Sequence, residues 1–333
     1  GAAMSTRTWN KDRAAKRIQQ KIDEVALKDF QIKNYVRDTD LHRLAKNVAY
    51  RVDGVHLYAD ILNLKDMLHV TQVEGETCHR RVLRFLNLHY RAVERILNNE
   101  EALLIDFHNQ RLHSVVTKPY DDEAKRIHRA IAIGQLMIDV LAKTGEDADH
   151  PAAAVRVGID TGQALAVNNG RRGHREPLFL GEPANHAAKR SGGGSATGIY
   201  LTNKARNAIG LAADANEDAT ALTTEEIANS QAIAQLSSTV DGVVEDWKAD
   251  LDANPIGKFE FSGHTPPFAD LDLETLSVKN SRRQDAATVY GDIDGFTKYV
   301  GTNIADDEKA KHVVRALRVL RSELDAVLHE DFK

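Results

Sequence analysis

A segment near the C-terminus joins residue types that bind metal ions and phosphate. Residues 286–299 read Ala-Ala-Thr-Val-Tyr-Gly-Asp-Ile-Asp-Gly-Phe-Thr-Lys-Tyr, and the β-rich start of this segment predicts a strand that ends at Asp292. The following Gly295-Phe296-Thr297 opens an amphipathic helix, whose first-turn N–H groups and dipole favour phosphate. Asp292 and the carbonyl of Ile293 could therefore hold Mg²⁺ beside a triphosphate. Ordinary turn chemistry also produces this pattern, so the segment alone leaves both interpretations open.

A second pattern lies upstream, in two segments that together carry an amide and several basic residues. Residues 155–164 read Val-Arg-Val-Gly-Ile-Asp-Thr-Gly-Gln-Ala, and residues 180–190 read Leu-Gly-Glu-Pro-Ala-Asn-His-Ala-Ala-Lys-Arg. The first segment predicts a strand, and the second predicts a helix that begins near Ala184 and carries Asn185. Both patterns resemble signatures of the class III nucleotidyl cyclases, the adenylyl and guanylyl cyclase superfamily. That family has a first strand ending in Asp-Ile before Gly-Phe-Thr, an Arg-x-Gly-Ile-x-x-Gly strand, and a Gly-x-x-(Val/Ala)-Asn-x-Ala-x-Arg helix start.

The order of the two patterns indicates a tandem arrangement. In the family the aspartate motif precedes the asparagine motif within one domain, whereas here the better aspartate motif follows it. Another first strand is therefore needed, and residues 51–65 supply one that ends at Asp60 and Ile61. We expect one whole cyclase-like domain, followed by the first strand and helix of a second. The second metal aspartate and second asparagine of that unit would fall after Lys333.

The resemblance implies a reaction in which the ribose 3′-oxygen of a nucleoside triphosphate attacks the α-phosphorus and pyrophosphate leaves. It implies two metal ions, Mg²⁺ or Mn²⁺, bound at strand ends. The metal ligands implied are Asp60, Ile61, Asp292 and Ile293. Asn185 would orient the ribose, and Lys189 or Arg190 would stabilise charge at the α-phosphate. In the family these two sets come from different protomers or domains, so the resemblance implies a site at an interface and a homodimer.

The first domain departs from the family pattern around Asp60. The turn that should present Gly-Asp, and with it a second metal carboxylate, reads Asn109-Gln110, and an amide is a poor substitute for a charged ligand of Mg²⁺. Leu62-Asn63-Leu64 replaces Gly-Phe-Thr, and Lys189 takes the position of the transition-state Arg, with Arg190 beside it. We therefore expect the first domain's own metal site to be degenerate. A productive site would combine the second unit's aspartate with the amide and a cation of the first.

The resemblance assigns base selection to the residue four positions before the second metal position, which here is Asp106. A carboxylate there can accept N–H donors such as uracil N3–H or the guanine edge, although Asp106 also fits an ordinary polar strand end. The sequences Tyr50-Arg51 and Tyr58-Ala59-Asp60 resemble the pyrimidine cyclases of bacterial anti-phage systems, which make cyclic UMP or cyclic CMP. The substrate-binding residues that the resemblance implies are Gly295, Phe296, Thr297, Asp106, Tyr50 and Arg111.

Two functions are compatible with these residues. The first is a metal-dependent cyclase that converts a nucleoside triphosphate, UTP or CTP by resemblance, to a 3′,5′-cyclic nucleotide that a separate effector reads. The second is a pseudo-cyclase, a dimerisation or regulatory module without catalysis, which Gln110 favours. The basic loop of Arg171, Arg172, His174 and Arg175 either contacts triphosphate or is simply solvated.

The elements that must place these residues follow a strand–helix–hairpin–helix–strand order. After one or two N-terminal helices in residues 6–48 come a strand at 52–60, a helix at 69–99, a hairpin at 102–117, a helix at 121–143 and strands at 154–159 and 163–167. This order predicts an α+β fold, and the resemblance implies a ferredoxin-like, palm-type cyclase core.

The remaining chain adds to this core. We expect a helix from 184, a strand at 199–201, an insertion at about 213–253 with helices 223–229 and 237–251, and a late strand of the first domain at 258–262. A polar linker at 277–284 precedes the second unit, whose helix is predicted at 306–330. The expected domains are 1–48, made of a scar (Gly1-Ala-Ala) and N-terminal helices, then 49–276, and then 277–333.

Composition limits the class of protein. The 333 residues are 42% hydrophobic, enough for one sizeable core, and no apolar run approaches about 18 residues, so we expect no membrane anchor. The net charge of −5 argues against nucleic-acid binding, because such proteins usually carry a surplus of basic residues. The single Cys78 allows no intrachain disulfide and suits a reducing cytoplasm.

Overall fold

The computed structural model describes residues 8–37, 39–69, 76–108, 110–147, 150–168, 177–267 and 270–332. The chain divides into two compact units. The larger unit comprises Asp53–Gln163 and Pro183–Ile293, and the smaller comprises Gly1–Val52, Ala164–Glu182 and Asp294–Lys333. Two long strands, β2 (Val48–Ile61) and β7 (Val155–Val167), contribute residues to both units.

The main sheet has the strand order β3-β4-β2-β7-β8, with β1 paired to β2 and β9 paired to β7. In the larger unit, β3 (Leu103–His108) and β4 (Arg111–Val116) form the predicted hairpin, and β4 runs antiparallel to β2. β9 (Gly198–Leu201) runs parallel to β7. The prediction that the first strand lies between the hairpin and the 154–167 strands is confirmed, and the fold is α+β.

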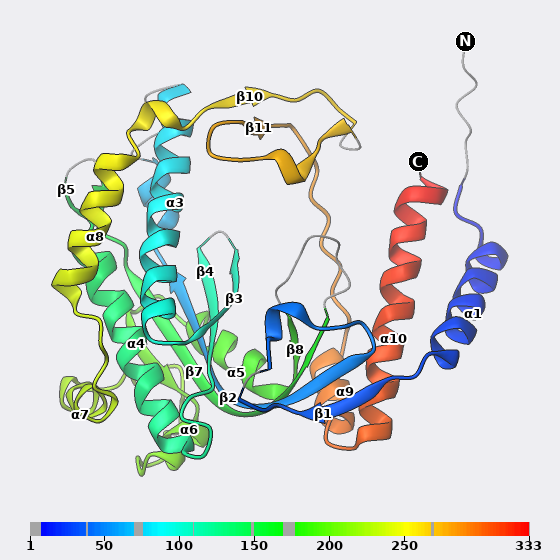
Figure 1. The fold of residues 1–333 in the computed structure, drawn as a ribbon, viewed down its shortest axis with the longest axis horizontal. Helices are drawn as coiled ribbons and strands as arrows, with labels where there is room; N and C mark the ends of the chain where they lie inside the picture. Colours follow the sequence, from blue (N-terminus) through cyan, green and yellow to red (C-terminus); the bar gives the residue numbers. More distant parts are fainter. Residues whose placement is uncertain are drawn as a thin grey trace. The chain divides into compact units, whose positions relative to one another are not determined.

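One face of the larger unit's sheet is covered by helices that lie side by side in Figure 1. They are α3 (Glu76–Asn99), α4 (Glu123–Lys143) and α8 (Val240–Ala253). Val55 and Leu57 of β2 are fully buried in the core with apolar residues of these helices. Because successive side chains of a strand point to opposite faces, Tyr58 and Asp60 lie on the other face of the sheet.

That other face carries α5 (Glu182–Ser191), which packs closely on β7 at Gly158. A Cβ atom at Gly158 would overlap the carbonyl of Ala187 and the amide nitrogen of Ser191, so the close approach requires glycine. Arg156, two residues earlier on the strand, is buried and donates hydrogen bonds to the carbonyls of Arg190, Ala196 and Asp218. Arg156 and Gly158, the Arg-x-Gly part of the sequence pattern, therefore hold α5 and the residues that follow it in place.

The predicted insertion is helical. It contains α7 (Thr224–Ala234) and α8, which confirm the two helices expected at 223–229 and 237–251. Other short elements of the larger unit are α2 (Leu64–His69), the paired strands β5 (Glu146–Asp147) and β6 (His150–Pro151), and α6 (Asn203–Ala208). No helix in the described residues is long and apolar enough to cross a bilayer.

The smaller unit is built from both ends of the chain. Its elements are α1 (Lys11–Leu27), β1 (Gln31–Asn34), β8 (Leu178–Leu180), α9 (Phe296–Asn303) and α10 (Asp307–Ala326), which continues as a π-helical turn at Val327–Asp331. β1 runs parallel to β2, β8 runs antiparallel to β7, and α1 lies beside α10 (Figure 1). Among the described residues of 6–48 only α1 is α-helical, and the helix predicted at 306–330 is confirmed by α10.

Two predicted strands are wrong. Residues 284–293 form no strand, and Val289 and Tyr290 are 90% and 83% exposed, because no described strand pairs with this segment. The late strand expected at 258–262 is instead β10 (Phe261–Gly263), which pairs with β11 (Ser281–Arg283) in a separate two-stranded sheet. The residues of β11 were expected to be a polar linker.

Candidate functional site

Several candidate side chains share the sheet face opposite the α3–α4 core. Tyr58 and Asp60 of β2 lie opposite His113 and Arg111 of β4, and Asp106 of β3 pairs with His113 from the other side. Directly opposed residues of antiparallel strands point to the same face. The sheet therefore brings together Asp60, Asp106 and Arg111, three of the residues singled out from the sequence.

The carboxylate of Asp60 accepts hydrogen bonds from two side chains of the same chain. Arg111 donates two hydrogen bonds to it, from Nε to Oδ1 at 2.8 Å and from Nη2 to Oδ2 at 2.9 Å. Ser191, the last residue of α5, donates from Oγ to Oδ2 at 3.3 Å. The Asp60 side chain is only 11% exposed, and its hydrogen bonds raise the pKa of Arg111. Arg111, expected from the sequence to contact substrate, is thus directed at Asp60.

Aromatic rings lie next to this ion pair. The rings of Tyr58 and His113 stack with centroids 4.2 Å apart, and His56 Nδ1 lies 3.0 Å from His113 Nε2. Burial lowers the pKa of His56 to about 3, lowers that of His113 and raises that of Tyr58 to about 12. All three rings are therefore uncharged at neutral pH, and they stack in a row in which His56 and His113 are buried and Tyr58 is half-buried.

Two candidate cations follow Asn185 on α5, and their side chains have different surroundings. Residues four apart on a helix share a face, so Asn185 and the exposed Lys189 lie on one side of α5. Arg190 instead donates from Nη1 to Glu217 at 2.6 Å, and its Nε lies 2.8 Å from Asp218. Lys189 is thus the cation on the face of Asn185.

A buried carboxylate, that of Asp160, lies beneath the start of α5 and was assigned no site role from the sequence. It accepts a hydrogen bond from Thr202 Oγ1, and its other oxygen lies 3.4 Å from Nδ1 of His186, the neighbour of Asn185. Burial raises the pKa of Asp160. The signal in the sequence was its place two residues after Gly158, on the strand face that α5 covers.

The predicted metal and phosphate segment is exposed over residues 286–295. Asp292 lies in coil before α9, and Ile293 is 46% exposed. Gly295, with a φ of 68°, caps α9, and Phe296 packs in the core of the smaller unit. Thr297 lies in the first turn of α9. These positions leave the Asp292 carboxylate exposed to solvent.

Two predicted contacts to substrate remain, namely Tyr50 and the basic loop of Arg171, Arg172, His174 and Arg175. Tyr50 is half-buried on β2, beside Arg51, whose guanidinium binds Asp307 at 2.7 Å and the carbonyl of Ile304 at 2.7 Å. Arg51 therefore supports the turn between α9 and α10. The four basic loop residues lie outside the described residues.

The family resemblance implies divalent metal ions, and the residues fit them differently at the two aspartates. Within the described chain no group of three or more His, Cys, Asp or Glu could hold a metal ion. At Asp60 the fit is poor, because both oxygens already accept hydrogen bonds and the neighbouring Gln110 is a neutral, exposed amide. At Asp292 an exposed carboxylate and the adjacent Ile293 carbonyl fit a hard cation.

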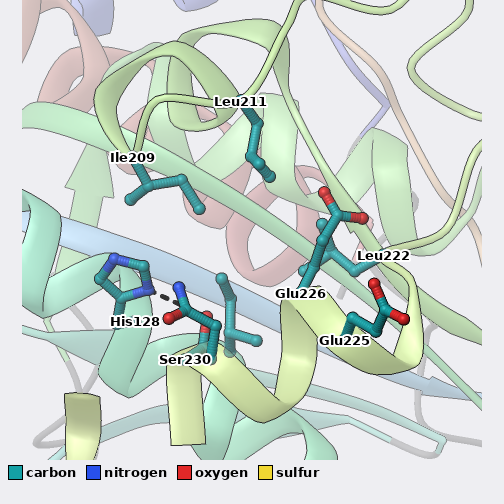
Figure 2. Close-up of a pocket in the computed structure, with 9 residues that line it drawn as sticks. His128, Ile209, Leu211, Leu222, Glu225, Glu226 and Ser230 are labelled. Carbon is teal, nitrogen blue, oxygen red and sulfur yellow. Dashed lines mark hydrogen bonds between the residues drawn. The ribbon is translucent and has the colours of Figure 1, made fainter. Parts of the chain in front are cut away.

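A separate pocket lies in the larger unit, between α4, α7 and the chain after α6 (Figure 2). Its volume is about 240 Å³, and its walls are mostly apolar, including Ile131, Ile209 and Leu211. His128 Nδ1 lies 2.9 Å from Ser230 Oγ at this pocket. None of the site residues predicted from the sequence lines it.

Comparison with known proteins gives close relatives. Two curated proteins named uridylate cyclase, from Pseudomonas aeruginosa and a Rhizobium species, are 56% and 34% identical over 333 and 305 residues. These alignments cover 98% and 85% of this chain, and the chain spans 64% and 57% of the relatives' lengths. No protein-family model matches the chain.

A solved structure is also similar across nearly the whole chain. The crystal structure of a class III adenylyl cyclase-like ATP-binding protein from Pseudomonas aeruginosa matches with a TM-score of 0.88 and 55% sequence identity. The match covers 98% of this chain and 69% of that one.

Proposed function

Since the chain belongs to the class III nucleotidyl cyclase family, we propose that it is part of a cyclase that converts UTP to 3′,5′-cyclic UMP and pyrophosphate. The observation that carries the proposal is the 56% identity, over 98% of this chain, to a relative named uridylate cyclase. CTP is the alternative substrate. The proposal includes a ferredoxin-like, palm-type core in residues 49–276 and the start of a second such unit in residues 277–333.

In the proposed reaction the 3′-oxygen of the ribose attacks the α-phosphorus. The new O3′–P bond forms as the bond from that phosphorus to the pyrophosphate oxygen breaks, and the hydroxyl proton passes to solvent. Asn185 holds the ribose so that this attack is in line, and Lys189 stabilises the charge that grows on the α-phosphate. A divalent ion bound at Asp292 and the Ile293 carbonyl would supply neutralisation of the triphosphate and a lower pKa for the attacking hydroxyl.

The base would be recognised on the sheet face described above. Asp106 can accept the N3–H of uracil, and the half-buried ring of Tyr58, which stacks on His113, is the neighbouring aromatic group that the base could contact. Cytosine lacks that N3–H but carries an exocyclic amine, so Asp106 alone separates uracil from cytosine only weakly. Tyr50 and the first turn of α9, Gly295-Phe296-Thr297, complete the proposed substrate contacts.

Assembly and cellular context extend the proposal. A homodimer would bring the α5 face of one copy to the Asp292 segment of another, and two Mg²⁺ or Mn²⁺ ions would require a carboxylate beyond the described residues. The cyclic nucleotide would act in the cytoplasm on a separate effector, in defence against phage.

A pseudo-cyclase is the second candidate, and one observation favours it. Asp60 is neutralised by Arg111, and the neighbouring second carboxylate is replaced by Gln110. If Asp292 were equally unable to bind metal, the chain would be a dimerisation module. The two candidates therefore differ in whether any cyclic nucleotide is made.

Product analysis separates them. The full-length protein, incubated with ATP, GTP, CTP or UTP and Mn²⁺ or Mg²⁺, should release cyclic UMP from UTP in preference to the other three. Asn185→Ala should lower kcat by roughly 10²-fold with a smaller change in KM, because its hydrogen bond acts mainly as the ribose is aligned. No cyclic product from any of the four would leave the pseudo-cyclase as the function.

A further inference from the structure

We propose that Arg111 is a built-in cation that takes the place of a metal ion at Asp60, so that this half of the chain binds no divalent metal. The inference rests on the proposed function only in treating Asp60 as the counterpart of a metal-binding aspartate. The contacts that carry it are those of Arg111, Asp60 and the end of α5.

The guanidinium covers both oxygens of the carboxylate. Its two N–H donors lie 2.8 and 2.9 Å from the two oxygens of Asp60, the bidentate geometry that matches a planar carboxylate best. The donor and acceptor sit directly opposite each other on β4 and β2, so backbone pairing fixes their separation. Pairing on a rigid sheet keeps the entropy cost of holding the two side chains small.

The C-terminal end of α5 also favours a positive charge at the position of the Arg111 guanidinium. Ser191 donates to Asp60, and the next residue, Gly192, is so close to the guanidinium that a Cβ there would lie 3.0 Å from Arg111 Nη2. A helix C-terminus carries partial negative charge from its unpaired carbonyls. Arg111 therefore faces two sources of negative charge, a full one on Asp60 and a partial one on α5.

A metal ion would meet two obstacles here. It would have to displace a bidentate hydrogen-bonded cation, and Mg²⁺ demands a nearly complete octahedron of oxygen ligands. In the family pattern a carboxylate adds a second charged ligand, but here that position is Gln110. The backbone carbonyl of Gln110 already accepts a hydrogen bond from the amide of Ile61 at 3.0 Å. With one carboxylate and no second charge, Asp60 would hold a divalent ion only weakly, too weakly to displace the bidentate Arg111.

The replacement also has a structural consequence for Asn185. The Arg111–Asp60–Ser191 contacts tie the last turn of α5 to the β2–β4 pair. Because a guanidinium is charged at every physiological pH, this tie does not depend on metal concentration. The helix that carries Asn185 and Lys189 is therefore held in position before any metal or nucleotide binds.

Thermal unfolding with and without Mn²⁺ tests this, in a chain in which Asp292→Asn removes the other aspartate. With Arg111 intact, millimolar Mn²⁺ should leave the Tm unchanged, and electron paramagnetic resonance should detect no bound Mn²⁺ that depends on Asp60. Arg111→Met should lower the Tm by roughly 3–8 °C, because it leaves a mostly buried carboxylate unpaired. Mn²⁺ should then recover at least about 2 °C of that loss.

Two controls accompany these variants. Arg95→Met breaks a comparable pair with Asp250, 2.9 Å apart in the same unit, and its Tm should not respond to Mn²⁺. Asp60→Asn combined with Arg111→Met should also lose the response. Mn²⁺ that binds through Asp60 while Arg111 is present would overturn the inference, and so would an Arg111→Met chain that ignores Mn²⁺. Neither readout uses cyclase activity, so failure here is separate from failure of the proposed function.

Discussion

Lys189 and Arg190 are adjacent in sequence, yet their surroundings differ. Arg190 is held by Glu217 and Asp218, which lie in the segment between α6 and α7, whereas Lys189 is exposed on the face of Asn185. The sequence identified the pair but could not choose between them, because the partners of Arg190 are distant along the chain. Only the folded loop distinguishes a packing cation from an available one.

Substitutions should separate these two roles. Lys189→Ala should lower kcat for cyclic UMP formation by roughly 10²-fold with little change in Tm, since the role proposed for the exposed ammonium is to stabilise developing charge. Arg190→Met should lower the Tm by several degrees, because Glu217 and Asp218 each lose a cationic partner. Lys189→Arg serves as the conservative control and should retain most activity. Equal loss of stability in Lys189→Ala and Arg190→Met would contradict the assignment.

The Asp60 region shows what residue patterns predict and what they omit. The pair Asn109-Gln110 predicted a degenerate metal site, since a missing carboxylate is visible in the sequence. The cation that occupies the position was not predicted, because Arg111 was assigned to substrate. A bidentate pair depends on strand register, and register is set by pairing rather than by local sequence.

At the level of elements, the sheet was predictable where neighbouring strands are present to pair. The strand β2, the β3–β4 hairpin and β7 each show the apolar pattern of a buried strand, and they pair as predicted. The segment 286–292 has the same β-rich composition but no strand beside it in the described structure. A β-rich composition indicates that a segment could form a strand, whereas a neighbouring strand decides whether it does.

The contact between α1 and α10 was not predictable in the same way, because it joins the two ends of the chain. Asp331, with a side chain 1% exposed, lies 2.7 Å from both Arg13 and Arg17, and Arg17 also binds Glu323 at 2.6 Å. Hydrogen bonds from Arg17 and then from Arg13 lower the pKa of Asp331 to about 2. The N-terminal helix is therefore attached through a carboxylate that stays ionised in mild acid.

This attachment should be lost in strong acid. A carboxylate whose pKa is depressed on folding stabilises the folded state above its unfolded pKa of about 3.9, and the gain disappears as pH falls through the folded value. Asp331→Asn should thus lower the free energy of unfolding at pH 7, and the difference from the unsubstituted chain should shrink between pH 4 and 2. Urea unfolding across that range measures it. A difference that stays constant down to pH 2 would show that Asp331 contributes through packing alone.

At the scale of the whole molecule, the proposed catalytic groups divide into two sets. One set is Asn185 and Lys189 on α5, held in place by Gly158, Arg156 and Arg111. The other is the exposed Asp292 segment, whose strand-like residues lack a neighbouring strand in the described structure. Since Asp60 is paired with Arg111, we propose that the metal-bearing counterpart of Asn185 comes from the second set.

Mixing two inactive variants of the full-length protein tests whether the sets meet across copies. Asn185→Ala and Asp292→Ala should each abolish or severely reduce cyclic UMP formation while leaving the Tm within a few degrees. In a homodimer with two shared sites, half of randomly mixed dimers contain both variants and each of these keeps one intact site, so an equal mixture should recover about a quarter of full activity. A chain carrying both substitutions, mixed with either single variant, is the control and should recover none. Failure of the two single variants to recover any activity, with heterodimers verified by mass, would place both sets of one site in the same copy.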